Sequence, residues 1–288
     1  MGEVFFCATN DGSAGLFNKN VDDIYHSTHG AYSESYEKFL LSSGFLDFIK
    51  NNDKVSILDI CYGIGYNSKT ALDEILKLDK TLEVKIDALE YDEKLIKISP
   101  FIKNQLINNN INKFLINNID LYQNYTVKDI IKSFIELKGM KYINWANIWH
   151  FKLDKILSRY KYPPLIKTPA FLHNIYYNYL SYRNKNGNKT NSLTKTAFVF
   201  HCDDARSCVL NLYNKYNFIF LDAFTPKKLP TLWSYEFFKE LYRLLDENGV
   251  LVTYSSSAAI RGAMIEVGFH IGCSLDKNNK RIGTIATK

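Results

Sequence analysis

The stretch VSILDICYGIGYN, Val55 to Asn67, decides how the rest of the chain is interpreted. An apolar run with β-branched side chains reaches the acidic residue Asp59 and then gives way to small residues. This pattern is typical of a buried parallel strand that turns sharply into a helix. The stretch therefore predicts a strand–turn–helix unit at the edge where parallel sheets bind their ligands.

The same alternation continues on both sides of this unit and predicts a doubly wound, mainly parallel α/β sheet of seven strands, of the Rossmann-like class. Helices are expected over 33–50, 68–78, 235–245 and 258–267, with another after residue 92 that Pro100 interrupts. Further strands are expected at 84–92, 196–204, 217–224 and 249–255, in a terminal pair at 269–275 and 281–287, and KFLINNI (113–119) is a candidate for one more.

Length and composition favour one large domain. The chain has 288 residues, 46% hydrophobic and 23% charged, and we expect a single domain over 1–288 with an extension at 1–50 on the substrate side. No secretory signal or membrane-length apolar run is visible, so we expect a cytoplasmic protein without membrane contact. The five cysteines include no CxxC pair, which fits a reducing compartment. We expect no metal site, because no group of His and Cys residues has the spacing of metal ligands.

Charge is concentrated in residues 121–195. This segment holds 13 Lys and Arg against 3 Asp and Glu, a net charge of +10, whereas the remainder carries −4. Tyrosines and tryptophans lie between the cations, as in surfaces that bind nucleic acid. We interpret the segment as a basic helical insertion that holds RNA, with Lys152, Lys155 and Arg159 as candidate phosphate contacts. An Asn-, Lys- and Tyr-rich background composition would explain the same residues.

The turn after the first strand has the spacing acidic-x-small-x-Gly-x-Gly, from Asp59 to Gly65. A dinucleotide fingerprint would need a third glycine where Ser68 stands. The spacing instead matches the loop that S-adenosylmethionine enzymes place under the methionine and ribose of their cofactor, where glycines allow close backbone approach. A plain βα turn is the alternative.

Acidic residues follow the other strands that should end at this edge. Glu90 closes the strand in ALEYD, where a carboxylate can accept both ribose hydroxyls of a nucleoside. Asp204 follows the strand TAFVFH and is the candidate partner of an adenine amino group. Together with the glycine turn, these acids predict a binding site for S-adenosyl-L-methionine.

LDAFTPKKLPTLW, Leu221 to Trp233, is the segment expected to carry the chemistry. Asp222 ends a buried run, and a carboxylate there can orient an amine and take up its proton, while methyl transfer itself depends on positioning. Phe224 and Trp233 are candidate pocket residues, although packing of a stiff loop would explain them equally well.

The chain resembles the methyltransferase module of the bifunctional MnmC-type tRNA wobble-uridine enzymes. Matching stretches occur in the same order along both ends of the chain: TNDGSAGLFNKNVDDIYHSTHGAYSESYEKFL, DICYGIGYN, ALEYD, DDAR, FLDAFTPKKLPTLW, GVLVTYSSSAAIRGAMIEVGF and KRIGTIAT. The resemblance implies a class I methyltransferase fold. It also implies S-adenosyl-L-methionine as cofactor, the anticodon region of tRNA as partner, and conversion of 5-aminomethyl-(2-thio)uridine to 5-methylaminomethyl-(2-thio)uridine.

Carried over residue by residue, the resemblance implies cofactor roles for Gly63, Gly65, Asn67, Glu90 and Asp204. It implies a catalytic-pocket role for Asp222 and a pocket role for Glu34 within AYSES. The full predicted site adds their neighbours: Tyr62, Tyr91, Asp203 and Ala205 at the cofactor, Phe224 beside Asp222, and Glu34, Pro226 and Trp233 at the substrate.

The chain departs from the family pattern at three places. Cys61 replaces the first glycine of the turn, residues 121–195 match nothing in the family, and the oxidase module that usually follows is not expected here. Two other functions stay open. A spermidine synthase-like aminopropyltransferase would show a second acid shortly after Asp222, which Ala-Phe-Thr-Pro lacks. A non-catalytic RNA-binding module with a vestigial cofactor pocket would not need the acids Glu90, Asp204 and Asp222, so their presence disfavours this alternative.

Overall fold

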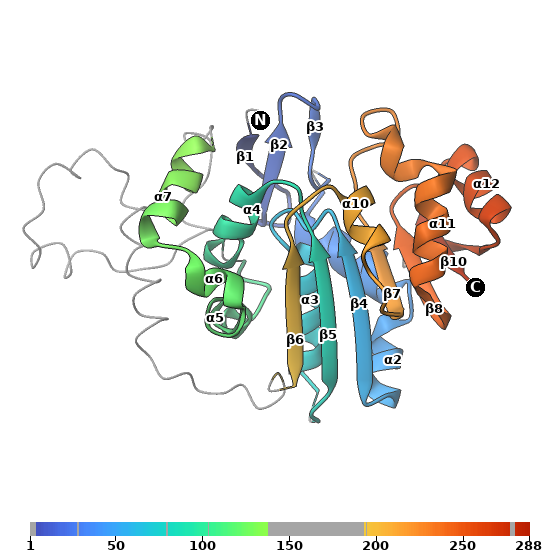
Figure 1. The fold of residues 1–288 in the computed structure, drawn as a ribbon, viewed down its shortest axis with the longest axis horizontal. Coiled ribbons are helices and arrows are strands. Elements are labelled where there is room, and N and C mark those ends of the chain that lie inside the picture. Colours follow the sequence, from blue (N-terminus) through green and yellow to red (C-terminus); the bar gives the residue numbers. More distant parts are fainter. Residues whose placement is uncertain are drawn as a thin grey trace, which may run out of the picture.

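The structure is a computed structural model that describes residues 4–27, 29–78, 80–102, 104–137, 193, 195–276 and 280–288. Its centre is a seven-stranded sheet in the order β6-β5-β4-β7-β8-β10-β9 (Figure 1). The first five strands are parallel, and β10 pairs antiparallel with both β8 and β9. The predicted doubly wound, mainly parallel sheet is therefore confirmed. The strands are β4 Lys54–Ile60, β5 Glu83–Leu89, β6 Thr196–His201, β7 Tyr216–Leu221, β8 Leu245–Thr253, β9 His270–Leu275 and β10 Arg281–Thr287.

Two apolar layers enclose the central strands because alternate side chains of each strand point to opposite faces. Phe218 and Phe220 of β7 belong to one layer, whereas Ile219 and Leu221 belong to the other. The first layer packs against α2 (Phe45–Asn51), α3 (Tyr66–Leu76), α4 (Glu93–Ile98) and α5 (Asn109–Asn118). The second packs against α10 (Ala205–Leu210), α11 (Tyr235–Leu244) and α12 (Ala258–Val267).

The first fifty residues contain more structure than the sequence indicated. A three-stranded antiparallel sheet, β1 (Val4–Ala8), β2 (Ala14–Asn18) and β3 (Asp23–Ile24), lies beyond the carboxyl ends of the central strands (Figure 1). The helix expected over 33–50 is interrupted. It consists of α1 (Ala31–Glu34), a π-helix (Ser35–Leu41) and α2, because Gly44 adopts a left-handed conformation with φ 74°.

The candidate strand at 113–119 is wrong, because these residues belong to helix α5 and its end. Ile111 and Leu115 lie four residues apart and are both fully buried, and Asn108 caps the helix by accepting from the amide of Asn110. The place beside β5 is taken by β6. Helices α6 (Asp120–Asn124) and α7 (Val127–Glu136) follow.

Most of the predicted insertion, from residue 138 to 192, lies outside the described residues, so the division into domains stays a prediction. Within the described ranges, no helix is long and apolar enough to cross a membrane. The same ranges contain no group of three or more His, Cys, Asp or Glu side chains that could hold a metal ion. All five cysteines are free.

Candidate active site

A cavity of about 430 Å³ lies at the carboxyl ends of β4, β5, β6 and β7, under the N-terminal sheet. This is the edge at which doubly wound sheets bind ligands, and the volume lies in the range of small-molecule sites. The cavity brings together seven of the predicted site residues: Glu90, Tyr91, Asp203, Asp204, Ala205, Asp222 and Phe224.

The glycine turn lies next to this cavity, because Cys61 lines it and the amide of Gly63 donates to Glu90. Gly63 and Gly65 have φ values of 59° and 83°, in the left-handed region that favours glycine. A Cβ on Gly65 would lie 2.2 Å from the ring of Tyr62, which is buried and bonds Ser99 through its hydroxyl. These three turn residues are absent from the described lining of the cavity, whereas Cys61 contributes to it.

Cys61 has φ 63°, so it occupies a conformation that glycine adopts at lower cost. The resemblance described above implies a glycine at this position. Cys61 therefore combines a left-handed backbone conformation with a place in the lining of the cavity.

Glu90 ties the turn to the end of β5. One carboxylate oxygen accepts from the amide of Gly63 at 2.7 Å, and the other accepts from the amide of Asp92 at 2.8 Å. Burial raises the pKa of this carboxyl to about 7, although the two amide hydrogen bonds oppose the shift. Glu90 therefore titrates near neutral pH, and its remaining lone pairs are available to ribose hydroxyls.

The acids after β6 begin helix α10. Asp204 caps the helix by accepting from the amide of Arg206 at 2.9 Å, and it also pairs with the guanidinium of that residue. These interactions with Arg206 lower the pKa of Asp204, so the carboxyl is ionised at neutral pH. Asp203 accepts from the amide of Asp204 at 2.7 Å.

Asp222 follows β7, and its side chain is buried at the edge of the cavity. Its Oδ2 accepts from the side-chain amide of Asn67 at 3.0 Å and lies 3.6 Å from Nδ1 of His26. Burial, followed by the negative charge of Glu34, raises its pKa well above the usual value. A carboxyl with a raised pKa can accept a proton from a cationic amine and release it again near neutral pH.

Glu34 lies behind Asp222 and does not appear in the described lining of the cavity. Its carboxylate accepts from the amide of Ser27 at 2.7 Å and pairs with Lys38. Burial would raise the pKa of Glu34, but Lys38 and the hydrogen bonds lower it below the usual value. The residue is thus a buried anion that acts on Asp222 and His26 through its charge.

The loop after Asp222 is held by Trp233. The indole nitrogen donates to the carbonyl of Phe224 at 2.8 Å, and the Trp233 side chain is buried. Trp233 and Pro226 are absent from the described cavity lining, so the structure gives Trp233 a supporting position. The candidate phosphate contacts Lys152, Lys155 and Arg159 lie outside the described residues.

The N-terminal sheet supplies residues that sequence reasoning missed. Asn18, Val21 and Tyr25 line the cavity, and the ring of Tyr25 meets that of Phe224 edge to face at 4.7 Å. Two polar contacts join the same segments: the amide of Thr225 donates to Asp23 at 3.4 Å, and Lys228 pairs with Asp22 at 3.4 Å. The only signal for this wall was that the segment resembles the family.

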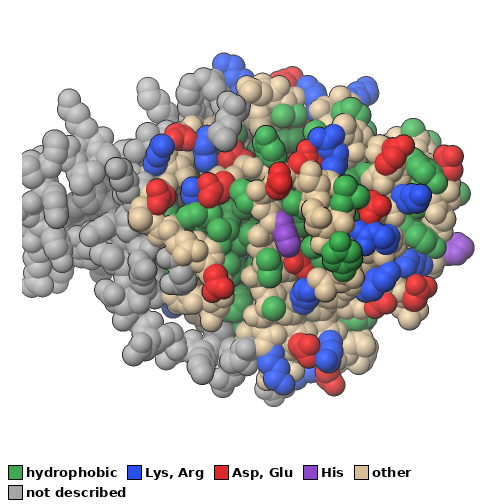
Figure 2. All heavy atoms as spheres, viewed as in Figure 1, with side chains coloured by type: hydrophobic (Ala, Val, Ile, Leu, Met, Phe, Trp, Pro, Cys, Tyr) green, Lys and Arg blue, Asp and Glu red, His purple; other side chains and the backbone are tan. Residues whose placement is uncertain are grey.

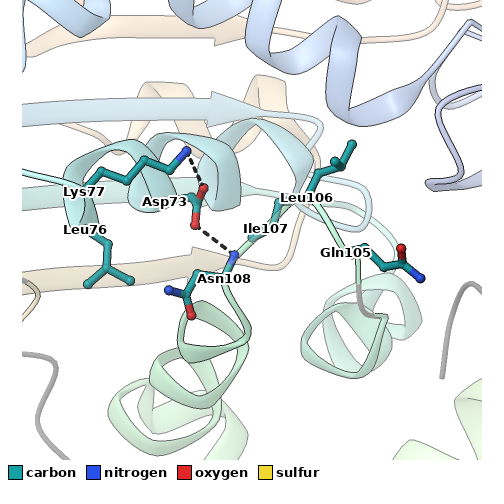
Figure 3. Close-up of a pocket in the computed structure, with 7 residues that line it drawn as sticks. All are labelled: Asp73, Leu76, Lys77, Gln105, Leu106, Ile107 and Asn108. Carbon is teal, nitrogen blue, oxygen red and sulfur yellow. Dashed lines mark hydrogen bonds and ion pairs between the residues drawn. The ribbon is translucent and has the colours of Figure 1, made fainter. Parts of the chain in front are cut away.

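A smaller hollow of about 240 Å³ lies away from this edge, between the end of α3 and the segment before α5 (Figure 3). Its acid, Asp73, already accepts from the amide of Asn108 at 2.8 Å and pairs with Lys77 at 3.0 Å. Since these groups satisfy one another, the hollow offers no charged group that lacks a protein partner.

The large cavity fits a nucleoside cofactor. It combines a left-handed turn with acidic residues at three strand ends, Glu90, Asp204 and Asp222. The side-chain oxygen of Asn67, beside Asp222, is buried and has no hydrogen-bond partner among the residues that the structure describes. Glu90, held by the amide of Gly63, would bind the ribose side and Asp204 the base side, while Asp222, held by Asn67, would face the reacting end.

Comparison with known proteins finds a family match in the C-terminal part of the chain. Residues 167–288 match the model of a family described as S-adenosyl-L-methionine-dependent methyltransferases. An uncharacterised protein of Methanocaldococcus jannaschii is 28% identical over 97% of this chain and 58% of its own length. The chain therefore spans less than two thirds of that relative.

Two further similarities concern tRNA-modifying proteins. The tRNA 5-methylaminomethyl-2-thiouridine biosynthesis bifunctional protein MnmC of Burkholderia thailandensis is 41% identical over 66 residues, which are 23% of this chain and 10% of that protein. The crystal structure of MnmC2 from Aquifex aeolicus has a TM-score of 0.62 and 24% identity, covering 100% of this chain and 71% of that one. This structural likeness supports the fold.

Proposed function

We propose that this S-adenosyl-L-methionine-dependent methyltransferase methylates the amino nitrogen of 5-aminomethyl-uridine, with or without a 2-thio group, at the tRNA wobble position. The observation that carries the proposal is Asp222, a buried carboxyl with a raised pKa at the wall of the cofactor cavity. An amine substrate is a cation at neutral pH and needs such a base before its nitrogen can attack.

The chain's own residues account for the remaining requirements of the reaction. When bound, S-adenosylmethionine supplies an electrophilic methyl group on its sulfonium. Asp222 removes a proton from the substrate ammonium and frees the nitrogen lone pair, while Asn67 fixes the carboxyl through its 3.0 Å hydrogen bond. Tyr25 and Phe224 present aromatic surface beside Asp222, on which a uracil ring can stack.

Binding of tRNA is assigned to residues 121–195 on the basis of charge. On the face shown in Figure 2, acidic and basic side chains are interspersed over the described part of the molecule. The segment 121–195 carries +10, whereas the remainder carries −4. A polyanion would therefore approach through this segment, including the candidate contacts Lys152, Lys155 and Arg159.

The test is to incubate the protein with methyl-labelled S-adenosylmethionine and bulk tRNA that carries unmethylated 5-aminomethyl-uridine. After digestion to nucleosides, we expect the label in 5-methylaminomethyl-(2-thio)uridine. Asp222→Ala and tRNA without the aminomethyl group are the controls, and both should give background label. Label in any other nucleoside, or cofactor binding without transfer, would reject this substrate.

A further inference from the structure

His26 is a buried imidazole directly behind Asp222 that the mechanism described so far does not use. His26 is 7% exposed, and its ring meets the ring of Tyr66 edge to face at 5.2 Å. Nδ1 lies 3.6 Å from Asp222 Oδ2, and Nε2 is buried without a hydrogen-bond partner among the described residues. His26 is not among the described residues that line the cavity, so it can act on the substrate only through Asp222.

We propose that His26 is a positioning residue that takes over the proton which Asp222 removes from the substrate amine. The proposal rests on the function proposed above, because only an amine substrate delivers this proton. The separation of 3.6 Å is slightly longer than a hydrogen bond, and catalytic hydrogen bonds commonly shorten when the ligands bind.

The charges around His26 suit this role. Glu34 on α1 and Asp11 in the β1–β2 turn both favour the protonated imidazole. Lys38 on the π-helix pairs with Glu34, and Tyr66 on α3 contacts the imidazole with its ring. Burial outweighs the two anions and lowers the pKa of His26. The imidazole is thus neutral at pH 7 and has a nitrogen free to accept a proton, and Glu34 and Asp11 reduce, without cancelling, the cost of forming the buried cation.

The proton balance is complete without any additional reactant. The substrate enters as a primary ammonium and loses one proton to the Asp222 carboxylate, which transfers it to Nδ1 of His26. The freed lone pair forms the new N–C bond as the S–C bond breaks, and the product leaves as a secondary ammonium with a neutral thioether. The proton on His26 is the one released to solvent in each turnover.

The decisive experiment measures kcat on saturating tRNA and cofactor from pH 6 to 9.5. The variants are His26→Phe, which keeps the ring contact with Tyr66, and His26→Gln, which keeps polarity but does not titrate. His29→Gln is the matched control, because His29 is exposed and lies in the same segment. Cofactor affinity of each protein is measured by calorimetry.

We expect both His26 variants to lose about tenfold to a hundredfold in kcat at pH 7. The deficit should shrink by about tenfold for each pH unit, because at higher pH the amine loses its proton without help. Cofactor affinity should change less than about threefold, and His29→Gln should match the wild type. A deficit that stays constant across this pH range would show a purely structural role and overturn the proposal.

A second measurement does not depend on turnover. The ring of His26 is titrated by nuclear magnetic resonance in the wild type and in Asp222→Asn. Because a nearby carboxylate favours imidazolium, the Asn variant should lower the His26 pKa. If the His26 pKa is the same in Asp222→Asn as in the wild type, the two residues are not electrostatically coupled. If the wild type fails to methylate aminomethyl-uridine while this coupling is present, the proposed function is wrong and the pairing of His26 with Asp222 stands.

Discussion

At the scale of single residues, Glu90 shows how burial sets the working range of the site. Its pKa rises from 4.5 to about 7 through burial, so the folded protein binds this proton more tightly than the unfolded chain does. The stabilisation that this proton provides is present below the unfolded pKa and is lost as the pH rises through about 7. The ionised form, which we propose accepts from the ribose hydroxyls, dominates above that pH.

Cofactor affinity should therefore depend on pH through Glu90. We expect the dissociation constant for S-adenosylmethionine to rise by up to about tenfold for each pH unit below 7, because Glu90 must ionise on binding. Glu90→Gln should flatten this dependence. Glu90→Ala should weaken binding by about tenfold to a hundredfold at pH 8, since a hydrogen bond to a charged group contributes about 1.5–3 kcal/mol. Calorimetry between pH 5.5 and 8.5 checks this, and an unchanged constant would remove Glu90 from the site.

Asp222 should affect turnover more than cofactor binding. Asp222→Ala should lower kcat by about a hundredfold or more, while the dissociation constant for the cofactor changes little, because proton removal matters in the transition state. Asp222→Asn should keep more activity than Ala because it preserves the contact with Asn67. Single-turnover rates on saturating tRNA measure the effect, and a wild-type rate in the Ala variant contradicts the catalytic assignment.

The residues that could be predicted from sequence are those tied to strand ends. Glu90, Asp204 and Asp222 each follow an apolar run, and the topology brings such positions to one edge. His26 and Tyr25 could not be predicted in the same way. Their roles depend on contacts with the loop after β7, far away in the sequence, and no local periodicity records such contacts.

At the scale of elements, the turn between β4 and α3 tolerates no side chain at Gly65. Gly65→Ala should destabilise the fold by about 2 kcal/mol or more, because left-handed backbone costs about 1–2 kcal/mol and the Cβ would lie 2.2 Å from Tyr62. Gly262 in α12 is the control, since a Cβ there meets nothing within 4 Å. Gly262→Ala should be neutral or stabilising by about 0.5–1 kcal/mol. Urea unfolding measures both, and equal midpoints would contradict the argument.

The elements also show where sequence patterns are ambiguous. KFLINNI is a short apolar run, and such a run fits either a buried strand or a buried helix segment. Tertiary packing determines that this run is a helix and not a strand. Because β6 pairs with β5, the segment packs as α5 against the sheet, in the same apolar layer as α3 and α4.

At the scale of the whole molecule, the charge asymmetry predicts how tRNA binding responds to salt. The logarithm of the tRNA-binding constant falls linearly with the logarithm of the salt concentration. If Lys152, Lys155 and Arg159 contact phosphates, neutralising all three should make this slope shallower by up to about three units and weaken the binding of many different tRNAs to a similar extent. Cofactor affinity should not change, because the residues that line the cavity belong to the rest of the chain. Binding measured across a salt series tests this, and identical slopes would mean that the basic composition is background.

Val4, the first residue that the structure describes, and Lys288 lie toward opposite ends of the central sheet, which matters for any protein joined to either terminus. Val4 pairs with Asn18, which lines the cavity, so a tag or domain fused before residue 4 would sit beside the cofactor. Thr287 pairs with Val250, and β10 runs antiparallel to β8, so Lys288 points toward the amino ends of the parallel strands. A fusion partner attached after Lys288 would therefore leave the mouth of the cavity unobstructed.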